Sequence, residues 1–297
     1  MIFVGKKNST SFFLLISLIL GLALYTALFS SCVYEDLSKC SRMFMLQPRY
    51  LLHTGEGDRF GEAVHHIDVY AFDSLGIYRK MFRDKGAHLK NGYRMPIDLP
   101  EGKWTFLCLG GKVGDYEIGI FKTGIPQQFS PAVSPGITTL SDFRVKAYFE
   151  QKENLEYSLG ELFFGRLDSM EITADNGGTG VVDLMKNTNK IEVRVKGIAD
   201  GSSARITSDN GRFNSENVTP ADAGTIIYVP YYSASQADDT RVFQFDVLRL
   251  YTDGHLFLKL LNPDGTDVIS GFTKDLINAI MSSPAYHTQE DLDREDT

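Results

Sequence analysis

A chain of 297 residues is long enough for two ordinary domains or one large one. It is 43% apolar and 23% charged, which excludes the disordered, collagen-like and coiled-coil classes, and its 20 Phe, 14 Tyr and 27 Gly favour β-rich structure. With 38 acidic and 30 scattered basic side chains, it is expected to have no nucleic-acid partner. Three cysteines are too few for a disulfide-rich scaffold and do not form a zinc-ligand set.

The N-terminus has the pattern of an export signal. Lys6 and Lys7 form a short basic region, and residues 12–29 carry no charge. Ser31 then stands directly before Cys32, where a lipoprotein signal peptidase needs a thiol for diacylglycerol attachment. We therefore expect signal cleavage between Ser31 and Cys32. A retained transmembrane helix is the alternative, because 18 mostly apolar residues lie near the lower end of what spans a bilayer.

Cleavage at this position makes residues 1–31 a lipoprotein signal peptide and residues 32–41 a lipidated tether. Each buried methylene of a lipid chain contributes about 0.8 kcal/mol, and more than one chain is needed for a stable anchor. A triacylated Cys32, carrying chains of the palmitate kind, would hold the protein on a membrane without any helix in the bilayer.

Period-two alternation of apolar residues predicts β-strands from Arg42 onward. Ile67, Val69 and Ala71 alternate with polar and aromatic neighbours in the clearest of these segments. Turns that contain Gly or Pro separate the predicted strands, which favours a β-sandwich over residues 42–168. The strands of this first set are expected at residues 43–48, 66–72, 93–99 and 103–109.

A second β-sandwich is expected over residues 169–297. A single helix is predicted at residues 274–282, where Leu276, Ile277 and Ile280 lie on one stripe. The fold class is therefore all-β, with two domains of a usual size. The strands of this second set are expected at residues 169–174, 180–185, 190–196, 225–230, 242–251 and 255–261.

Catalytic and metal-binding patterns were sought and none was found, so we expect no enzyme activity, no metal and no cofactor. His65 and His66 are adjacent, and adjacent strand residues point to opposite faces, so one metal site cannot easily use both. Residues 262–267 resemble a calcium loop but lack its later acidic ligand. Residues 175–180 are Gly-rich without the features of a phosphate loop. Trp104 lies in the middle of a predicted strand and is expected in the core.

Two thiols remain once Cys32 carries lipid. Cys40 and Cys108 can form a disulfide if their Cα atoms approach to about 5.5–6 Å, since thiols outside the cytoplasm tend to pair. Alternatively, Cys108 packs as a small core residue on its strand. The sequence leaves both possibilities open.

Several segments resemble Bacteroidales fimbrial-anchor lipoproteins, the FimB/Mfa-type minor fimbrium anchor family. They occur in the order of the family and cover essentially the whole mature chain. These segments are residues 32–40, 69–76, 99–111, 161–165, 186–197 and 288–296. In addition, the early acidic residues Glu35 and Asp36 resemble surface-export signals of Bacteroidota lipoproteins.

The resemblance implies two tandem transthyretin-like β-sandwiches, no enzyme activity and a surface-exposed, lipid-anchored position in the outer membrane. It implies that the protein anchors a fimbria or pilus at its base, limits or stabilises its growth, and binds pilin subunits by strand donation. Only Cys32, the lipidated residue, is carried over by position. Arg42 and Arg49 are the nearest basic sites at which a pilin of this class would lose its leader, and an anchor is expected to keep its first strand.

One departure from the family pattern concerns the C-terminus. The family continues past this segment into a further hydrophobic strand, whereas this sequence stops at Thr297. The second domain is therefore expected to lack its last strand, through truncation or because another subunit supplies that strand.

Two other kinds of surface protein and an enzyme are the alternatives. A glycan-binding lipoprotein of a polysaccharide-uptake system would need an exposed aromatic platform, for which Tyr231 and Tyr232 are the candidates. A pilus accessory protein or tip adhesin would share the fold. A hydrolase is the third alternative, because sequence does not exclude two carboxylates that meet in space.

Overall fold

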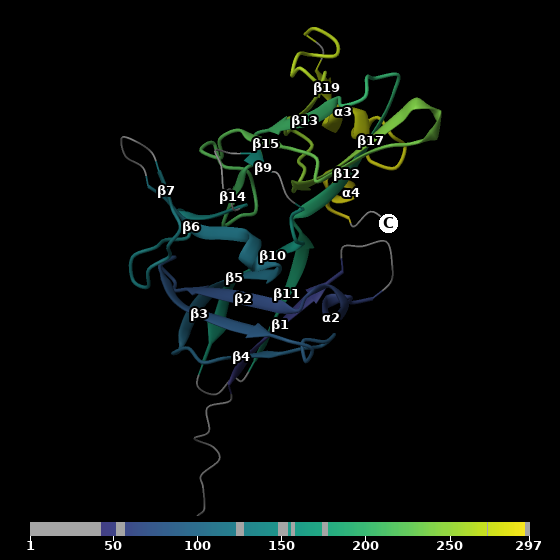
Figure 1. Ribbon diagram of the computed structural model, residues 1–297. Coiled ribbons are helices and arrows are strands. Elements are labelled where there is room, and N and C mark those ends of the chain that lie inside the picture. Colours follow the sequence, from purple (N-terminus) through teal and green to yellow (C-terminus); the bar gives the residue numbers. More distant parts are fainter. Residues whose placement is uncertain are drawn as a thin grey trace, which may run out of the picture. The chain divides into compact units, whose positions relative to one another are not determined.

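The computed structural model (Figure 1) describes residues 43–51, 57–122, 128–147, 154–155, 158–173, 178–271 and 273–294. The predicted signal peptide and tether, including Ser31, Cys32, Cys40 and Arg42, lie outside these ranges. Within them, no helix is long and apolar enough to cross a membrane.

A seven-stranded sheet forms the first part of the fold, in the order β3-β2-β5-β10-β11-β1-β4. The strand β1 lies in its interior, parallel to β11 and antiparallel to β4. The seven strands are β1 (Phe44–Tyr50), β2 (His66–Phe72), β3 (Tyr78–Lys85), β4 (Met95–Ile97), β5 (Gly102–Gly111), β10 (Leu162–Ile172) and β11 (Thr179–Lys186).

Strand β2 shows how alternation builds two cores. Ile67, Val69 and Ala71 are fully buried in a cluster formed by this sheet and the short helix α2 (Phe60–Ala63). Tyr70 and Phe72 point to the other face and enter a second, larger cluster. Because both faces of β2 are covered, almost the whole strand is buried.

Three smaller sheets complete the fold. One consists of β14 (Arg212–Asn214), β8 (Phe143–Ala147), β6 (Tyr116–Lys122) and β7 (Gln128–Ser130). The second consists of β19 (Lys274–Asp275), β18 (Leu256–Leu261), β13 (Ser203–Ser208), β15 (Ile226–Tyr228) and β9 (Asn154–Leu155). The third consists of β12 (Thr188–Lys196), β17 (Thr240–Leu248) and β16 (Tyr232–Ser235).

Short helices join or close these sheets. The predicted helix at residues 274–282 is found as α3 (Leu276–Met281), whereas α4 (Gln289–Asp293) was not predicted. The side chain of Asp275 caps α3 by accepting hydrogen bonds from the next backbone amides. Two 3-10 turns, η2 (Val113–Asp115) and η3 (Ala237–Asp239), complete the helical segments of the described ranges.

The all-β class is confirmed in its coarse form, as a mostly β protein with several sheets. The predicted boundary between residues 42–168 and 169–297 does not separate two sheets. Strands on both sides of this boundary belong to the same seven-stranded sheet. The strand β10 runs through this point with a register shift after Leu167, and Ser169 has a φ of 53°. The next strand, β11, also belongs to the first sheet, because it pairs with β1. The division stays a prediction about folding units.

Candidate functional site: the first strand and its partners

The first strand after the predicted tether is paired on both of its sides. Residues Met45–Tyr50 are in register with Thr179–Leu184 of β11, and residues Phe44–Leu46 face Met95–Ile97 of β4. An interior strand has its backbone groups in two ladders, unlike an edge strand, which leaves one row open. Strand β1 is therefore an integral part of the sheet.

Side chains of β1 also supply the core beneath the sheet. Phe44, Leu46 and Tyr50 are at most 2% exposed. The ring of Phe44 stacks on Phe106 at a centroid distance of 5.9 Å, and the ring of Tyr50 meets Phe163 edge-on at 4.9 Å. Pairs of this geometry add about 0.5–1.5 kcal/mol to the burial of the rings.

Arg49 forms a bidentate ion pair with Asp183, its register partner on β11. The Nε–Oδ1 distance is 2.8 Å and the Nη2–Oδ2 distance is 3.0 Å. Hydrogen bonds and the charge of Asp183 raise the pKa of Arg49. Both side chains are more than one-third exposed, so solvent screens the pair and it contributes little to stability. The ladders and the buried rings therefore hold β1 in place, and the ion pair adds specificity of register.

The end of β1 is fixed to the next element. The Asp58 carboxylate accepts hydrogen bonds from the amides of Tyr50 and Phe60, both at 2.9 Å. The amide of Arg59 in turn donates to the carbonyl oxygen of Tyr50 at 3.0 Å. The exit of β1 is thus tied to helix α2 as well as to the sheet.

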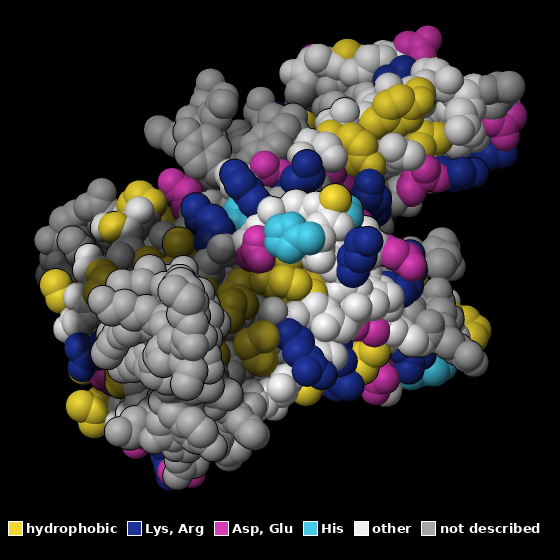
Figure 2. Space-filling model, turned by 90° about the horizontal axis from the view of Figure 1, so that it is seen from below, with side chains coloured by type: hydrophobic (Ala, Val, Ile, Leu, Met, Phe, Trp, Pro, Cys, Tyr) yellow, Lys and Arg dark blue, Asp and Glu magenta, His cyan; other side chains and the backbone are white. Residues whose placement is uncertain are grey.

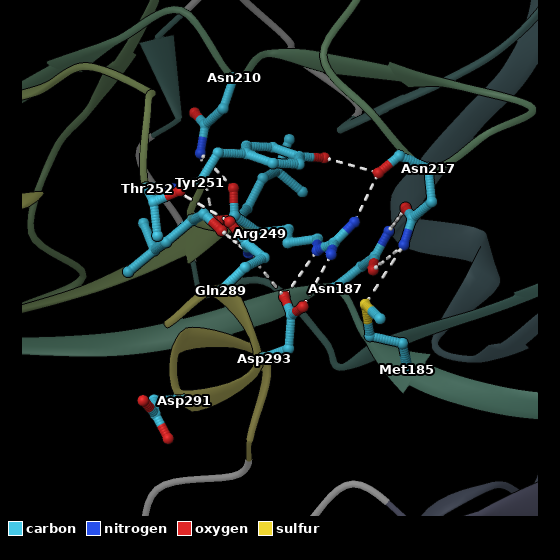
Figure 3. A network of polar contacts seen from close by, with 12 residues as sticks. Met185, Asn187, Asn210, Asn217, Arg249, Tyr251, Thr252, Gln289, Asp291 and Asp293 are labelled. Atoms are coloured by element: carbon cyan, nitrogen blue, oxygen red, sulfur yellow. Dashed lines mark hydrogen bonds and ion pairs between the residues drawn. The ribbon is translucent and has the colours of Figure 1, made fainter. Parts of the chain in front are cut away.

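A buried polar network links the far end of β11 to the C-terminal helix (Figure 3). Asn217 donates to Asn187 Oδ1 at 3.0 Å and to Met185 Sδ at 3.5 Å. Its carbonyl oxygen accepts from Arg249 Nη1 at 2.6 Å, and Arg249 forms two hydrogen bonds of 2.7 Å with Asp293. Residues distant in sequence are thereby joined from β11 to α4.

Burial and charge act in opposite directions on Arg249. Burial by itself would lower its pKa, but the hydrogen bonds and the charge of Asp293 outweigh it, and the pKa of Arg249 is raised. Gln289 in α4 supports the pair, because its Nε2 donates to the carbonyl oxygen of Leu250 and to Asp293 Oδ1. Breaking one partner of such a pair leaves an uncompensated buried charge.

Of the cysteines predicted to have a role, only Cys108 lies in the described residues. Its thiol is fully buried in β5 and pairs with no described cysteine, and burial raises its pKa. The structure therefore shows Cys108 as a core residue. Its pairing with Cys40 stays a prediction, because Cys40 lies outside the described ranges, as does the lipidation of Cys32.

Of the other residues singled out in the sequence, His65 and His66 both line one cavity, although they are adjacent in the chain, while Trp104, Tyr231 and Tyr232 do not line it. Trp104 is buried and donates from Nε1 to the carbonyl oxygen of Pro100 at 3.0 Å, as expected of a core residue. His66 Nε2 lies 2.9 Å from Asp68 Oδ1. Tyr231 is half-buried while Tyr232 is exposed on β16, so the two rings do not share one platform. The described residues contain no cluster of three or more potential metal ligands.

Sequence reasoning missed the partners of the site. Asp183 is 134 positions away from Arg49, and no local pattern marks it. Helix α4, in contrast, had a readable signal, because Thr288 and Asp291 form a capping box. Recognising that box would have placed Asp293 on a helix.

These features describe a mostly β protein. Its first strand is an interior strand of the sheet, and its helix α4 is held by the buried ion pair between Arg249 and Asp293. The family model for "Fimbrillin-A associated anchor proteins Mfa1 and Mfa2" matches residues 37–297, and the chain belongs to this family. It is a family of fimbrial anchor proteins, which are not enzymes. The function class expected from the sequence is thereby confirmed.

Known proteins similar to this chain agree with the family. The minor fimbrium anchoring subunit Mfa2 of Porphyromonas gingivalis is 25% identical over 284 residues, which is 91% of this chain and 82% of that protein. The crystal structure of P. gingivalis Mfa2 superposes with a TM-score of 0.66 at 20% identity, over 85% of this chain and 88% of that one. A candidate polysaccharide binding protein of Bacteroides thetaiotaomicron has a TM-score of 0.69 at 21% identity, over 85% and 88%.

Proposed function

We propose that this protein anchors a fimbrium at its base as an outer-membrane lipoprotein, facing the cell surface, and limits or stabilises growth of the fibre. Lipid on Cys32 would hold it to the membrane. The observation that carries the proposal is the interior position of β1, because the predicted tether of residues 32–41 leads directly into this strand. A cut inside β1, after Arg49, would release the lipid together with most of an interior strand.

Loss of β1 by processing is incompatible with a stable fold. A cut after Arg49 would remove Phe44 and Leu46, which are buried, and truncation of each such residue costs about 2–5 kcal/mol. The loss is comparable with the whole stability of a typical protein, about 5–15 kcal/mol, and the ladders of β1 would be lost with it. We propose that Arg49 is not a processing site, in contrast to pilins that shed their leader. Arg42 precedes β1, so a cut there is tested by the N-terminus of the protein and not by the fold.

The N-terminus of protein from intact cells tests this part of the proposal. Mass spectrometry should find Cys32 as the first residue, with a mass increase for the attached acyl chains. A new terminus directly after Arg42 or Arg49 would identify a polymerising pilin instead. An unmodified Cys32 thiol would remove the membrane anchor from the proposal.

A cysteine variant tests anchorage itself. In cells that express only Cys32→Ala, fibres should be released into the medium, and their length should change. The Cys40→Ala variant is the matched control, since it removes a nearby thiol and leaves the signal cysteine in place. Fibres that stay on the cells in the Cys32→Ala strain would contradict the proposal. Immunogold labelling at the base of the fibre, and not at its tip, separates an anchor from a tip adhesin.

Pilin binding by strand donation is the proposed mode of assembly. We propose the outer side of β12 as the acceptor, since β12 pairs only with β17 within the described ranges. A photo-crosslinking residue at the exposed Arg194 of β12 should capture a pilin subunit, while one at the exposed Lys103 of β5 should not. Equal capture at both positions would exclude this edge.

The finer fold assignment belongs to the same proposal. We propose that the sheets form two tandem transthyretin-like β-sandwiches. The several mostly antiparallel sheets of the described residues support this assignment. An experimental structure would test it, because the strands should then be seen to pack as two sandwiches.

A further inference from the structure

A large cavity among the described residues shares no lining residue with β1 or with the buried network. Its volume is about 990 Å³, at the upper end of the range for small-ligand sites. The ends of β3 and β5, the segment before β10, and β12 contribute to its walls. We refer to it below as the basic cleft.

The loop that forms one wall of the basic cleft is held rigidly. The amide of Gly160 donates to Asp115 Oδ2 at 2.9 Å, and the amide of Lys112 donates to the carbonyl oxygen of Glu161 at 2.8 Å. A Cβ on Gly160 would lie 2.3 Å from Lys112 Cβ, so the close approach of the two segments requires glycine there. This wall exists before any ligand binds.

All carboxylates of the basic cleft already have partners. Glu62 pairs with Arg59 at 2.9 Å, Asp115 accepts from the Gly160 amide, and Glu161 pairs with Lys186 at 2.8 Å. Cations outside the lining, Arg59 and Lys186, therefore match the charges of Glu62 and Glu161, whereas Asp115 keeps its negative charge.

The lysines of the basic cleft are in the opposite situation. Lys85, Lys112 and Lys190 line it and are exposed, and none forms an ion pair with another described residue. Lys190 is in register with Asp246 across the β12–β17 pair, and its charge acts to lower the pKa of Asp246, so Lys190 has a nearby counter-charge. Lys85 and Lys112 are thus the two lining lysines without a carboxylate partner among the described residues, in a protein whose net charge is −8. Figure 2 shows a face of the molecule on which Lys and Arg side chains gather around histidines.

The lining also limits the kind of ligand. No Trp, Tyr or Phe is among the described residues that line the cavity, so a neutral sugar would find no aromatic ring to stack on. Charge must then supply recognition, and the volume exceeds that of one phosphate ion. We propose that the basic cleft binds a small polyanion with at least two anionic groups, such as a phosphorylated or carboxylated saccharide.

Titration calorimetry of the full chain in a non-ionic detergent tests this site with two probes. Inorganic tripolyphosphate represents phosphate ligands, and a tri-galacturonate represents carboxylated saccharides. At least one of the two probes should bind saturably at 50 mM salt. Its affinity should be at least fivefold lower at 200 mM salt, because ions enter the open cleft and screen the charges. Binding of only one probe identifies the chemical class, and binding of neither overturns the proposal.

A charge-matched pair of variants locates the binding. The double variant Lys85→Gln, Lys112→Gln should bind the probe with at least tenfold lower affinity. Lys103→Gln with Lys274→Gln removes the same charge at exposed positions outside the cleft and should change affinity less than twofold. An equal loss in both double variants would show that net charge alone attracts the probe and would refute a site.

A second measurement does not depend on the variants. Lys112 in the unmodified chain should become at least fivefold slower to acetylate when the probe is saturating, while Lys103 keeps its rate. Peptide mass spectrometry measures both residues in one sample. Unchanged acetylation of Lys112 would contradict occupation of the basic cleft. The proposal is independent of anchorage, since none of these readouts involves lipid or fibres.

Discussion

The buried pair between Arg249 and Asp293 gives the sharpest stability prediction. Their side chains are only 10% and 5% exposed, and both hydrogen bonds measure 2.7 Å. Replacing Asp293 by Asn keeps the shape but leaves the guanidinium without its counter-charge, which we expect to cost about 3–5 kcal/mol. With a urea dependence of about 2–3 kcal/mol/M, the unfolding midpoint should fall by about 1–2.5 M.

Two controls make this prediction refutable. Glu290→Gln breaks an exposed contact of 3.1 Å with Arg294 in the same helix and should cost no more than about 0.5 kcal/mol. Arg249→Met with Asp293→Leu removes both charges and should recover most of the lost stability, since apolar residues can replace a buried pair. A loss below about 1 kcal/mol for Asp293→Asn, or a double variant no more stable than the single one, would refute the reasoning.

Three further changes test the core. Phe44→Ala should lower the free energy of unfolding by about 3–5 kcal/mol in urea titration, and a loss under about 1 kcal/mol would show that β1 is dispensable. Burial raises the pKa of Asp246 in the folded protein above its pKa in the unfolded chain. The folded protein therefore loses stability as the pH rises above the pKa of the unfolded chain and Asp246 becomes charged. Asp246→Asn should therefore be more stable than the unmodified chain at pH 7, with the gain fading toward pH 4; a gain that grows in acid would contradict this. With Cys32 and Cys40 replaced by Ser, Cys108 should react with a thiol reagent only on unfolding, since its thiol is buried with a raised pKa; rapid labelling of the native chain would contradict it.

Strands with clean alternation could be located from the sequence, and charged strands could not. The predicted strand at residues 66–72 has the observed bounds of β2, because aliphatic side chains alternate with other types along it and the two sets enter different cores. Strand β3 carries Arg79, Lys80 and Arg83 on its exposed positions and was not predicted. It is an edge strand, and edge strands carry such charges to prevent pairing with other chains. The charges that protect the edge strand therefore interrupt the alternation of apolar and polar residues from which a strand is predicted.

The candidate site was predictable only in part, because its contacts are long-range. Arg49 lies in β1, one residue beyond the strand predicted at residues 43–48, and its pairing with β11 depends on how the sheet closes. Strand register over so many residues has no local signature, since each strand alone fits several neighbours. The basic cleft was missed for the same reason, because its lysines come from β3, the end of β5 and β12.

The parallel pairing of β1 with β11 has a mechanical consequence. The chain enters β1 beside Thr179 and leaves β11 at the opposite end, at Lys186, toward the C-terminal sheets. Tension between the N-terminus and those sheets pulls β1 and β11 in opposite directions along their length. All hydrogen bonds between the two strands are therefore loaded in shear at the same time, and they cannot break one after another. The barrier to unfolding under force governs survival of such a joint. Pulling from the two ends of the chain should meet higher resistance than pulling β1 sideways out of the sheet.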